Sequence, residues 1–419
     1  MSWLRAGTAR RPRRLLALVG CAALAAVGAW GARADSEDQT PTGVGPAGGL
    51  ATGLTEVNPY LLGPIPGSAQ MRRWQARLGT LRPSVIRLPV VWSRLQPRSY
   101  RPPNLSAREL GCARGLRPCV AWLGVRAQLR AIRALQLRLA RRIDVLVVIY
   151  GTPSWANRPR FGCRQGGVTG ESRPVQLEDL PAYRRLVESL LAAGRAAGVR
   201  LRWWSAWNEP NTASFVNPQR LRCSAAAPSI APSLYAPLVR TLKAALDAAP
   251  GNQQIVLGEL SSPFAARARL TEPAEFVRGL PQDVACAGAV WSQHQYAGDA
   301  DDLTALQQAV DARGCPGPPR RFWITETGVG RAGPGRRRSL NPRVLRLGCQ
   351  RLNGLLLRWY ADPRTDLALQ YTFREDPAFT VGLADPRLRR LYPAYTLWRA
   401  WGQRGSSANP PPGLPSVCA

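Results

Sequence analysis

The sequence has 419 residues, of which 57 are Lys or Arg, 26 are Asp or Glu and one is His, giving a formal net charge of +31. Its 45% of apolar residues can fill a large core, which excludes a wholly disordered chain. The single histidine, His294, excludes multi-histidine metal sites and limits any Ser-His-Asp or Cys-His machinery to that residue. Acid–base chemistry is therefore expected to fall to carboxylates.

The first segment, residues 1–34, has the features of an export signal. Several arginines precede an apolar run over 15–30, and an Ala-Arg-Ala tripeptide at 32–34 follows it as a cleavage pattern. We predict a signal peptide, with an uncleaved membrane anchor as the alternative. Either one places the remaining chain outside the cytoplasm, in an extracellular or cell-surface location. Residues 35–50 are polar and rich in Gly and Pro, as expected of a linker.

From residue 51 onwards, short β-branched or aromatic runs alternate with stretches of helical period. The strand-like runs cover 53–57, 84–89, 144–150, 201–207, 254–260, 289–296, 321–326 and 366–373. The helix-like stretches cover 68–81, 124–142, 178–197, 233–248, 273–280, 302–313, 342–360 and 388–401. This alternation predicts an α/β fold, a parallel (β/α)8 TIM barrel over residues 51–402 with a tail at 403–419. No glycine-rich nucleotide-binding pattern follows the first strand.

Long segments rich in Pro, Gly, Trp and Asn follow several predicted strands. They cover 90–123, 151–177, 208–232 and 327–340. In such a barrel the segments after the strands gather at the carboxyl-terminal rim, where active sites are built. We therefore expect functional residues at the strand ends and in these insertions.

Two glutamates stand at predicted strand ends. Glu209 follows the fourth strand within Trp-Asn-Glu-Pro-Asn (207–211), and Glu326 ends the seventh within Ile-Thr-Glu-Thr-Gly (324–328). A polar residue in an apolar strand is costly unless it is paired or functional. Two carboxyl groups of opposed protonation are what hydrolysis of a glycosidic bond needs. Mutual repulsion would raise the pKa of one, while a cation such as Arg87 would keep the other ionised.

These motifs resemble those of glycoside hydrolase clan A, nearest to families 5 and 39, across about residues 50–402. The further segments that fit the clan's pattern, in the same order, are Ile86-Arg87-Leu88-Pro89 followed by Trp92, Gly151-Thr152-Pro153-Ser154-Trp155, and His294-Gln295-Tyr296. The resemblance implies a retaining β-glycosidase acting on an oligosaccharide or polysaccharide without cofactor or metal. In that mechanism Glu209 is the acid/base and Glu326 is the nucleophile.

The resemblance also implies roles for the residues around the pair. Asn208 would hold the 2-hydroxyl of the sugar, and His294 would line the −1 site. Arg87 and Tyr296 would hydrogen-bond Glu326 and keep it ionised. The structural alternatives are a buried salt bridge for Arg87 and a satisfied core histidine for His294.

Aromatic residues at the rim would offer flat faces to sugar rings, and we place Trp92 and Trp155 in this role, with wall packing as the alternative for Trp155. The clan usually carries a Trp platform on strand eight, which this sequence lacks. We predict Phe373 as the substitute, with Arg374 entering the site. Glu259, at the end of the fifth strand, is a rival carboxylate to which the clan's pattern gives no catalytic role, so we place it behind the pair.

Eight cysteines follow the leader, and an even number indicates disulfides in an oxidising compartment. Adjacency along the chain predicts the pairs Cys112–Cys119, Cys163–Cys223, Cys286–Cys315 and Cys349–Cys418. The surplus of arginine is scattered along predicted helices, so we expect no nucleic-acid partner. A barrel that has lost catalysis and binds glycans or the cell envelope is the alternative function. An esterase using a serine near His294 lacks a supporting Gly-x-Ser-x-Gly motif.

Overall fold

The computed structural model describes residues 49–56, 58–63, 69–107, 124–163, 169–262, 270–297, 302–332, 338–376, 379–404 and 414–418. The predicted leader, most of the linker and the predicted Cys112–Cys119 pair lie outside these residues.

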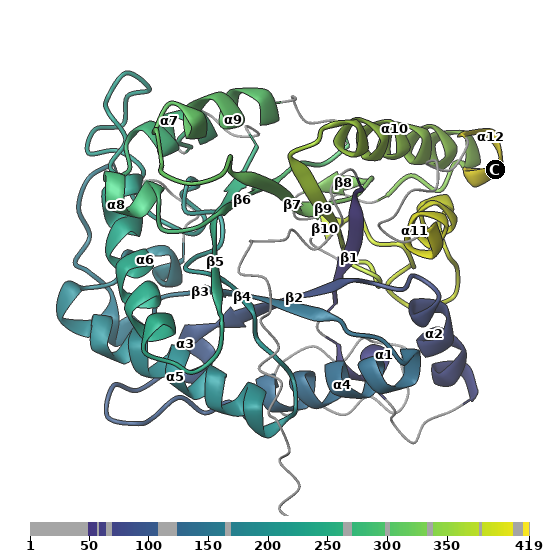
Figure 1. Cartoon of the computed structure of the whole chain (residues 1–419), viewed down its shortest axis with the longest axis horizontal. Helices are drawn as coiled ribbons and strands as arrows, with labels where there is room; N and C mark the ends of the chain where they lie inside the picture. The colour runs from purple at the N-terminus through teal and green to yellow at the C-terminus, as the bar shows by residue number, and fades with distance from the viewer. Residues whose placement is uncertain are drawn as a thin grey trace, which may run out of the picture. The chain divides into compact units, whose positions relative to one another are not determined.

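Eight parallel strands close into a barrel, which confirms the predicted fold (Figure 1). In order around the barrel they are β1 (Ala51–Thr55), β2 (Val85–Val91), β3 (Asp144–Tyr150), β4 (Trp203–Ser205), β5 (Gln254–Ser261), β6 (Val290–His294), β7 (Arg321–Thr327) and β9 (Thr365–Tyr371). Strand β9 pairs with β1 to complete the closure. A small antiparallel ribbon of β8 (Arg331–Ala332) and β10 (Phe379–Thr380) lies outside the barrel sheet.

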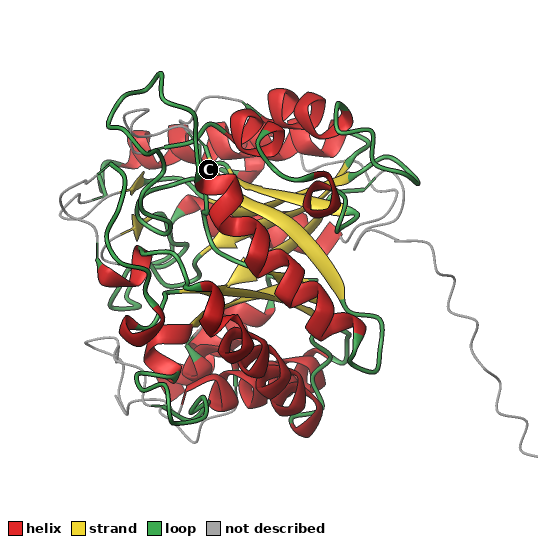
Figure 2. Ribbon diagram, turned by 90° about the vertical axis from the view of Figure 1, so that its left-hand side faces the viewer, coloured by secondary structure: helices red, strands yellow, loops and turns green. Residues whose placement is uncertain are grey.

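Helices surround the barrel strands, as the red and yellow ribbons of Figure 2 show. The longer ones are α2 (Ala69–Gly79), α4 (Gly124–Leu139), α5 (Leu180–Ala196), α6 (Ala231–Asp247), α9 (Leu303–Asp311), α10 (Pro342–Ala361) and α11 (Pro393–Arg404). The shorter ones are α1 (Pro59–Leu62), α3 (Trp92–Leu95), α7 (Pro273–Arg278), α8 (Gln282–Ala285) and α12 (Leu414–Val417). Each predicted helix has a counterpart here. In the described ranges, no helix is both long and apolar enough to cross a membrane.

Helix α5 shows why these segments pack as they do. Its buried residues Tyr183, Leu186, Val187 and Leu190 recur at intervals of three and four, which places them on one face of the helix. That face lies in the apolar layer between the helices and the sheet. Burial of such a face, more than intrinsic propensity, stabilises a helix of this length.

The lumen of the barrel is apolar towards the amino-terminal ends of the strands. Its buried cluster includes Val85, Val290, Trp203 and Trp323, and the two indole rings meet edge to face at 4.7 Å between centroids. Side chains alternate along a strand, so residues two or four positions further on face the same lumen. Where those positions are polar, as at Arg87, a charged layer lies above the apolar one.

Three disulfides confirm three of the four predicted cysteine pairs. Cys163–Cys223 joins the segments that follow β3 and β4. Cys286–Cys315 joins the C-terminal end of α8 to the loop before β7. Cys349–Cys418 joins α10 to the C-terminal segment. Such bridges are typical of a compartment outside the cytoplasm.

Candidate active site

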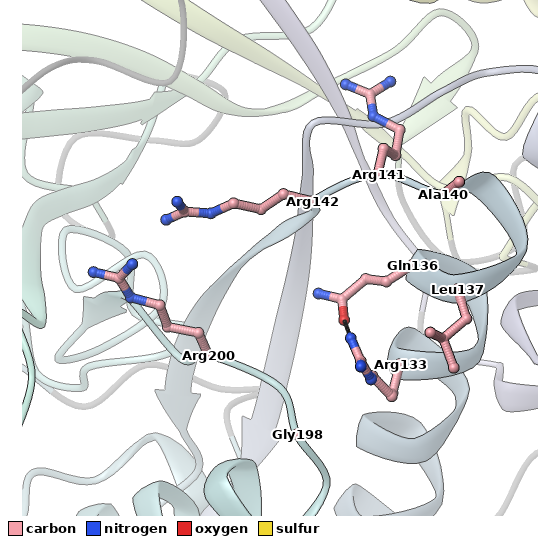
Figure 3. Close-up of a pocket in the computed structure, with 8 residues that line it drawn as sticks. All are labelled: Arg133, Gln136, Leu137, Ala140, Arg141, Arg142, Gly198 and Arg200. Carbon is pink, nitrogen blue, oxygen red and sulfur yellow. Dashed lines mark hydrogen bonds between the residues drawn. The ribbon is translucent and has the colours of Figure 1, made fainter. Parts of the chain in front are cut away.

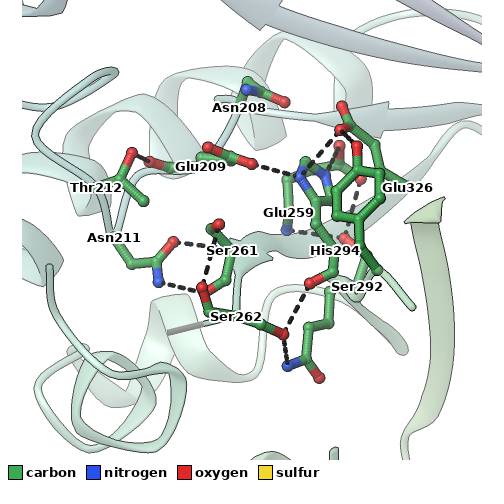
Figure 4. Close-up of polar contacts among 12 residues, drawn as sticks. Asn208, Glu209, Asn211, Thr212, Glu259, Ser261, Ser262, Ser292, His294 and Glu326 are labelled. Atoms are coloured by element: carbon green, nitrogen blue, oxygen red, sulfur yellow. Dashed lines mark hydrogen bonds and ion pairs between the residues drawn. The ribbon is translucent and has the colours of Figure 1, made fainter. Parts of the chain in front are cut away.

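Five charged side chains meet at the carboxyl-terminal ends of the strands, at the mouth of the barrel. They are Arg87 of β2, Glu209 after β4, Glu259 of β5, His294 of β6 and Glu326 of β7 (Figure 4 shows the four that are not arginine). Their exposed side-chain fractions divide them sharply: 2% for Arg87, 0% for Glu259 and 1% for His294, against 13% for Glu209 and 10% for Glu326. Within this network, solvent reaches mainly the two predicted catalytic carboxylates.

Glu209 and Glu326 lie close together although 117 positions separate their numbers in the sequence. Carboxylate oxygens of the two residues come within 4.8 Å of one another, and a ring nitrogen of His294 lies within the same span. Two carboxyl groups this close repel each other when both are ionised, so the arrangement favours one proton between them.

Glu326 is held by one partner from β2 and one from the segment directly after β6. Arg87 Nη1 lies 2.7 Å from its Oε1, and the hydroxyl of Tyr296 donates to its Oε2 at 2.6 Å. Both contacts are hydrogen bonds to a charged or ionisable carboxyl group, and together they fix the position of its two oxygens. The structure therefore brings together the two residues that the sequence resemblance paired with Glu326.

Glu209 has a different environment. Burial raises its pKa, and the hydrogen bond from His294 opposes this shift only in part; the charge of Glu326 adds to the rise. His294 Nδ1 lies 2.8 Å from Glu209 Oε1. Glu209 also has a positive φ of 39°, an uncommon conformation for a non-glycine residue, and its N–H donates to the carbonyl of Glu259 at 3.0 Å.

The segment that carries Glu209 is fixed to the neighbouring strand. Asn211 donates through its amide to the carbonyl of Ser261, and its Oδ1 accepts from the N–H of Ser261 (Figure 4). The same amide donates to the carbonyl of Thr271. These bonds satisfy buried backbone groups at the end of β5 and hold the two segments together.

Glu259 is the fully buried carboxylate of the network. Its Oε2 accepts from Arg87 at 2.8 Å (Nε) and 2.6 Å (Nη2), and lies 3.1 Å from His294 Nε2. Its Oε1 accepts from the hydroxyl of Ser292 at 3.1 Å. Burial by itself would raise the pKa of Glu259, but Arg87 and His294 outweigh it and lower the value to about 2.

His294 is the cation that joins the three carboxylates. Burial would lower its pKa, yet the charges and hydrogen bonds of Glu326, Glu209 and Glu259 raise it to about 10. The imidazole is therefore protonated near neutral pH, and both of its ring nitrogens are hydrogen-bond donors. Glu209, His294 and Glu326 lie close enough together to bind a metal ion, but a metal ligand must offer a lone pair, so an ion would first have to displace the proton of His294.

Two further predicted residues lie at or beside this network. Asn208 is buried, and its Oδ1 accepts from Arg87 Nη2. Trp155 is partly exposed in a short 3₁₀ helix (Ser154–Ala156), and its indole N–H donates to the carbonyl of Gln96 at 2.9 Å. Its packing against Trp92 shows a wall contact, with some of its surface still open to solvent.

The predictions for Trp92 and Phe373 as faces for sugar were wrong. Both side chains are fully buried in the layer between sheet and helices. Trp92 packs edge to face against Tyr183 at 5.6 Å between ring centroids, and Phe373 packs similarly against Trp74 at 6.1 Å. Neither has a ring face left for a ligand, because protein atoms cover it.

Tyr371, which the sequence reasoning missed, is the aromatic residue that β9 presents at the mouth. Leu367 and Leu369 of the same strand lie in the lumen, so the period of two places Tyr371 on the same face. Its ring lies 5.9 Å from that of Phe379, which in turn lies 6.3 Å from Tyr296. Alternation in the sequence predicts this face for Tyr371, but it predicts the same face for Phe373 two positions further on.

A separate pocket of about 680 Å³ lies at the opposite end of the barrel (Figure 3). Its lining residues precede β3 and β4, so they belong to the amino-terminal ends of the strands: Arg133, Gln136, Leu137, Ala140, Arg141, Arg142, Gly198 and Arg200. None of them is acidic. This pocket, which we call the foot pocket, therefore lacks the carboxylates that the mouth provides.

Solved structures with a similar fold include glycoside hydrolases. An endo-β1,6-glucanase matches with a TM-score of 0.54 at 12% identity, over 84% of this chain and 75% of that protein. A family 39 glycoside hydrolase from Bacteroides cellulosilyticus matches with a TM-score of 0.50 at 13% identity, over 83% of this chain and 65% of that protein's length. The chain shares the closed (β/α)8 barrel fold of these proteins. SrfJ from Salmonella typhimurium shares it, with a TM-score of 0.52 at 11% identity, over 84% and 74% of the two chains.

At these identities the likeness concerns the fold alone, and at that level it agrees with the sequence resemblance to clan A. No protein-family model matches the sequence, and the curated proteins contain no match to it. The residues themselves must carry any functional argument.

Proposed function

We propose that this chain is an exported retaining glycoside hydrolase that cleaves a β-linked oligosaccharide or polysaccharide by double displacement. In this proposal Glu209 is the general acid/base and Glu326 is the nucleophile. The glycoside hydrolase fold and the disulfides support the proposal at a coarse level, and the residues at the mouth supply its finer content.

The observation that carries the proposal is the approach of the Glu209 and Glu326 oxygens to within 4.8 Å of one another at the mouth of the barrel. Retaining enzymes place their two carboxyl groups about 5–5.5 Å apart, whereas inverting enzymes separate them by about 6.5–9.5 Å to admit a water molecule. The short separation favours direct attack by one carboxylate on the sugar.

The two environments divide the roles. Glu326 accepts from Arg87 and Tyr296, which fix its oxygens in place, so we assign it the role of nucleophile. Glu209 has a raised pKa, caused first by burial, which suits it to the role of general acid. Because the protonated His294 donates to Glu209 Oε1, the proton of Glu209 belongs on its other oxygen, where it can reach a leaving group.

In the first step Glu326 forms a bond to the anomeric carbon while the glycosidic carbon–oxygen bond breaks. The bonding electrons leave with the glycosidic oxygen, which takes the proton of Glu209. In the second step Glu209, now ionised, removes a proton from water as the water oxygen attacks the same carbon. The ester bond to Glu326 breaks, and both carboxyl groups return to their starting protonation.

The remaining residues at the mouth would bind the sugar. Asn208, whose Oδ1 accepts from Arg87, has its amide N–H groups for the 2-hydroxyl. The partly exposed rings of Trp155 and Tyr371 are suited to contact the apolar faces of sugars. Five charged groups in mutual contact leave little unbalanced charge at the mouth, which favours neutral sugars over acidic ones at the cleavage point.

The proposal is tested by Glu326→Gln and Glu209→Gln, assayed against a panel of neutral and acidic β-glycans. We expect Glu209→Gln to reduce hydrolysis by roughly 10²–10⁴-fold, as for loss of a general acid, and Glu326→Gln to reduce it at least as much. A mechanism-based fluoroglycoside should label the wild type at Glu326, identified by peptide mass, and should leave Glu326→Gln unlabelled.

A matched control is Asp366→Asn, which removes a buried carboxylate at the amino-terminal end of β9 and should leave turnover and labelling intact. Near-normal hydrolysis by Glu326→Gln, or labelling at another residue, contradicts the assignment. A folded wild type that binds a glycan but neither hydrolyses nor labels would instead be a glycan-binding barrel.

A further inference from the structure

Glu259 contacts the charged groups of the proposed reaction without being able to touch a substrate. Its side chain is 0% exposed, while its Oε2 lies within hydrogen-bonding distance of both Arg87 and His294. A buried carboxylate between two cations is costly to assemble unless every partner is in place. Its position therefore requires an explanation that contact with substrate cannot give.

An irregularity in the backbone of β5 turns the side chain of Glu259 towards the lumen. Val256 faces the lumen and Leu257 faces the helices, so strict alternation would turn Gly258 inwards and Glu259 outwards. The pairing of β5 with β6 shifts register between Leu257 and Leu260, a bulge that reverses this order.

Both residues of the bulge have positive φ, 98° at Gly258 and 53° at Glu259. A Cβ at Gly258 would lie 2.5 Å from the carbonyl oxygen of Ser292, so glycine is required there. Glu259, which has a Cβ, is held in a left-handed conformation by its surroundings. Strain of this kind gathers at functional sites, where neighbouring groups over-determine it.

The charges at the mouth can be counted group by group. Arg87 and His294 contribute two positive charges, and Glu259 cancels one of them. One positive charge is left for Glu209 and Glu326 together, which balances a single ionised carboxylate. A neutral network therefore contains one proton shared between these two residues, the state in which a retaining enzyme must start.

We propose that Glu259 is a positioning residue that keeps His294 protonated and Arg87 in place, and thereby keeps one proton on the Glu209–Glu326 pair. The proposal rests on the proposed function for its purpose, and its physical content is the charge state of His294. Without the carboxylate of Glu259, two cations would face the pair, and either Glu209 or His294 would release its proton more readily.

Among the residues that the structure describes, the other titratable groups close to this network are phenols. They are Tyr296 just after β6, Tyr371 of β9 and Tyr235 of α6, and burial raises the pKa of each above its ordinary value. All three stay neutral below pH 10, so they do not confuse a titration of the network over that range. The carboxylates that surround His294 are Glu209, Glu259 and Glu326.

The sequence supplies an unusually clean probe, because His294 is its single histidine. In untagged protein labelled with ¹⁵N-histidine, the imidazole nitrogen shifts report the protonation of this one residue. We expect wild-type His294 to remain an imidazolium through pH 8. A midpoint near the ordinary value of about 6.5 would overturn the proposal without any variant being needed.

In Glu259→Gln we expect the midpoint of His294 to fall by at least one pH unit, a tenfold loss of proton affinity. Glu259→Asp keeps the charge and should restore most of the shift. Asp366→Asn, the matched control at the other end of the barrel, should leave the midpoint where it is in the wild type. Equal midpoints in wild type and Glu259→Gln would contradict the proposal; if Glu259→Gln fails to fold, the wild-type titration and Glu259→Asp decide.

Kinetics provide the second readout. In Glu259→Gln we expect the basic limb of the kcat/KM profile, which reports the proton of Glu209, to move to lower pH by about one unit. A loss of activity with an unmoved pH profile would show a merely structural role and overturn the proposal. The NMR titration needs no turnover, so failure of the hydrolase proposal and failure of this one are distinguishable.

Discussion

The two ends of the barrel use arginine in opposite ways. At the mouth, Arg87 has a 2% exposed side chain and contacts two carboxylates, Glu259 and Glu326. At the foot, the side chain of Arg142 is 53% exposed and forms an ion pair with Asp144. At the mouth, positive and negative side chains are mostly buried and paired with one another. The arginines that line the foot pocket are instead fully or partly exposed to solvent. Net charge therefore says little about this protein's chemistry, because the surplus lies outside the proposed site.

The largest contrast should appear when one arginine is removed from each end. Arg87→Leu removes one of the two cations that contact the buried carboxylates Glu259 and Glu326, and we expect it to lower the free energy of unfolding by about 3–5 kcal/mol. Arg142→Leu breaks a solvent-screened pair and should cost about 0–1 kcal/mol. Urea unfolding at pH 6 measures both. Equal losses would show that the mouth network is no more tightly coupled than a surface ion pair.

The pH dependence of the free energy of unfolding should report on the mouth, because the two groups with large pKa shifts considered next, Glu259 and His294, both lie there. The pKa of Glu259 falls from 4.5 to about 2 in the folded state, so its contribution is present above pH 4.5 and is lost as the pH falls towards 2. The pKa of His294 rises from 6.5 to about 10, so its contribution is present below pH 6.5 and is lost as the pH rises towards 10. We expect maximal stability between pH 4.5 and 6.5.

The acid-side loss from Glu259 should be on the order of 3 kcal/mol. Urea unfolding across this pH range measures it, with Glu259→Gln as the comparison. The variant should be less stable at pH 6 and should show a flatter acid side. If its acid side is as steep as that of the wild type, other carboxylates are responsible.

The smallest effect should come from the foot pocket. Arg200 contacts Asn252 there and no carboxylate that the structure describes. We expect Arg200→Gln to change the free energy of unfolding by less than about 0.5 kcal/mol and kcat/KM by less than about twofold. A larger loss of turnover would mean that the foot pocket is coupled to the mouth, so that the two ends of the barrel do not differ in their importance for activity.

Much of the fold could be predicted because its signals are local and repeated. The β-branched run at 144–150 coincides with β3, and the alternation of strands and helices indicates the barrel. Short elements such as α3 (Trp92–Leu95) and the β8–β10 ribbon could not be predicted, because tertiary contacts rather than local pattern stabilise so few residues.

At the candidate site, sequence motifs and strand alternation predict some side-chain positions and fail for others. Motifs placed Glu209 and Glu326 at the strand ends, and the structure brings them together. Strict alternation fails for Glu259 and Glu326, since the register shifts in β5 and β7 decide which face each side chain takes. Alternation gives Tyr371 and Phe373 the same face, so only the end of β9 at Tyr371 and the burial of Phe373 beyond it separate the two. The burial of Trp92 depends on contacts with helix α5, which the local sequence does not specify.

The Cys163–Cys223 bridge has a consequence for how the protein must be made. It joins two cysteines 60 positions apart in two rim segments, and the second of these segments contains Glu209. In a host whose cytosol keeps thiols reduced, the chain would fold without the Cys163–Cys223 disulfide, and the two rim segments would not be covalently joined. Recombinant material for every assay above should therefore come from a periplasmic or oxidising host, and free-thiol titration should precede any conclusion that a preparation is inactive.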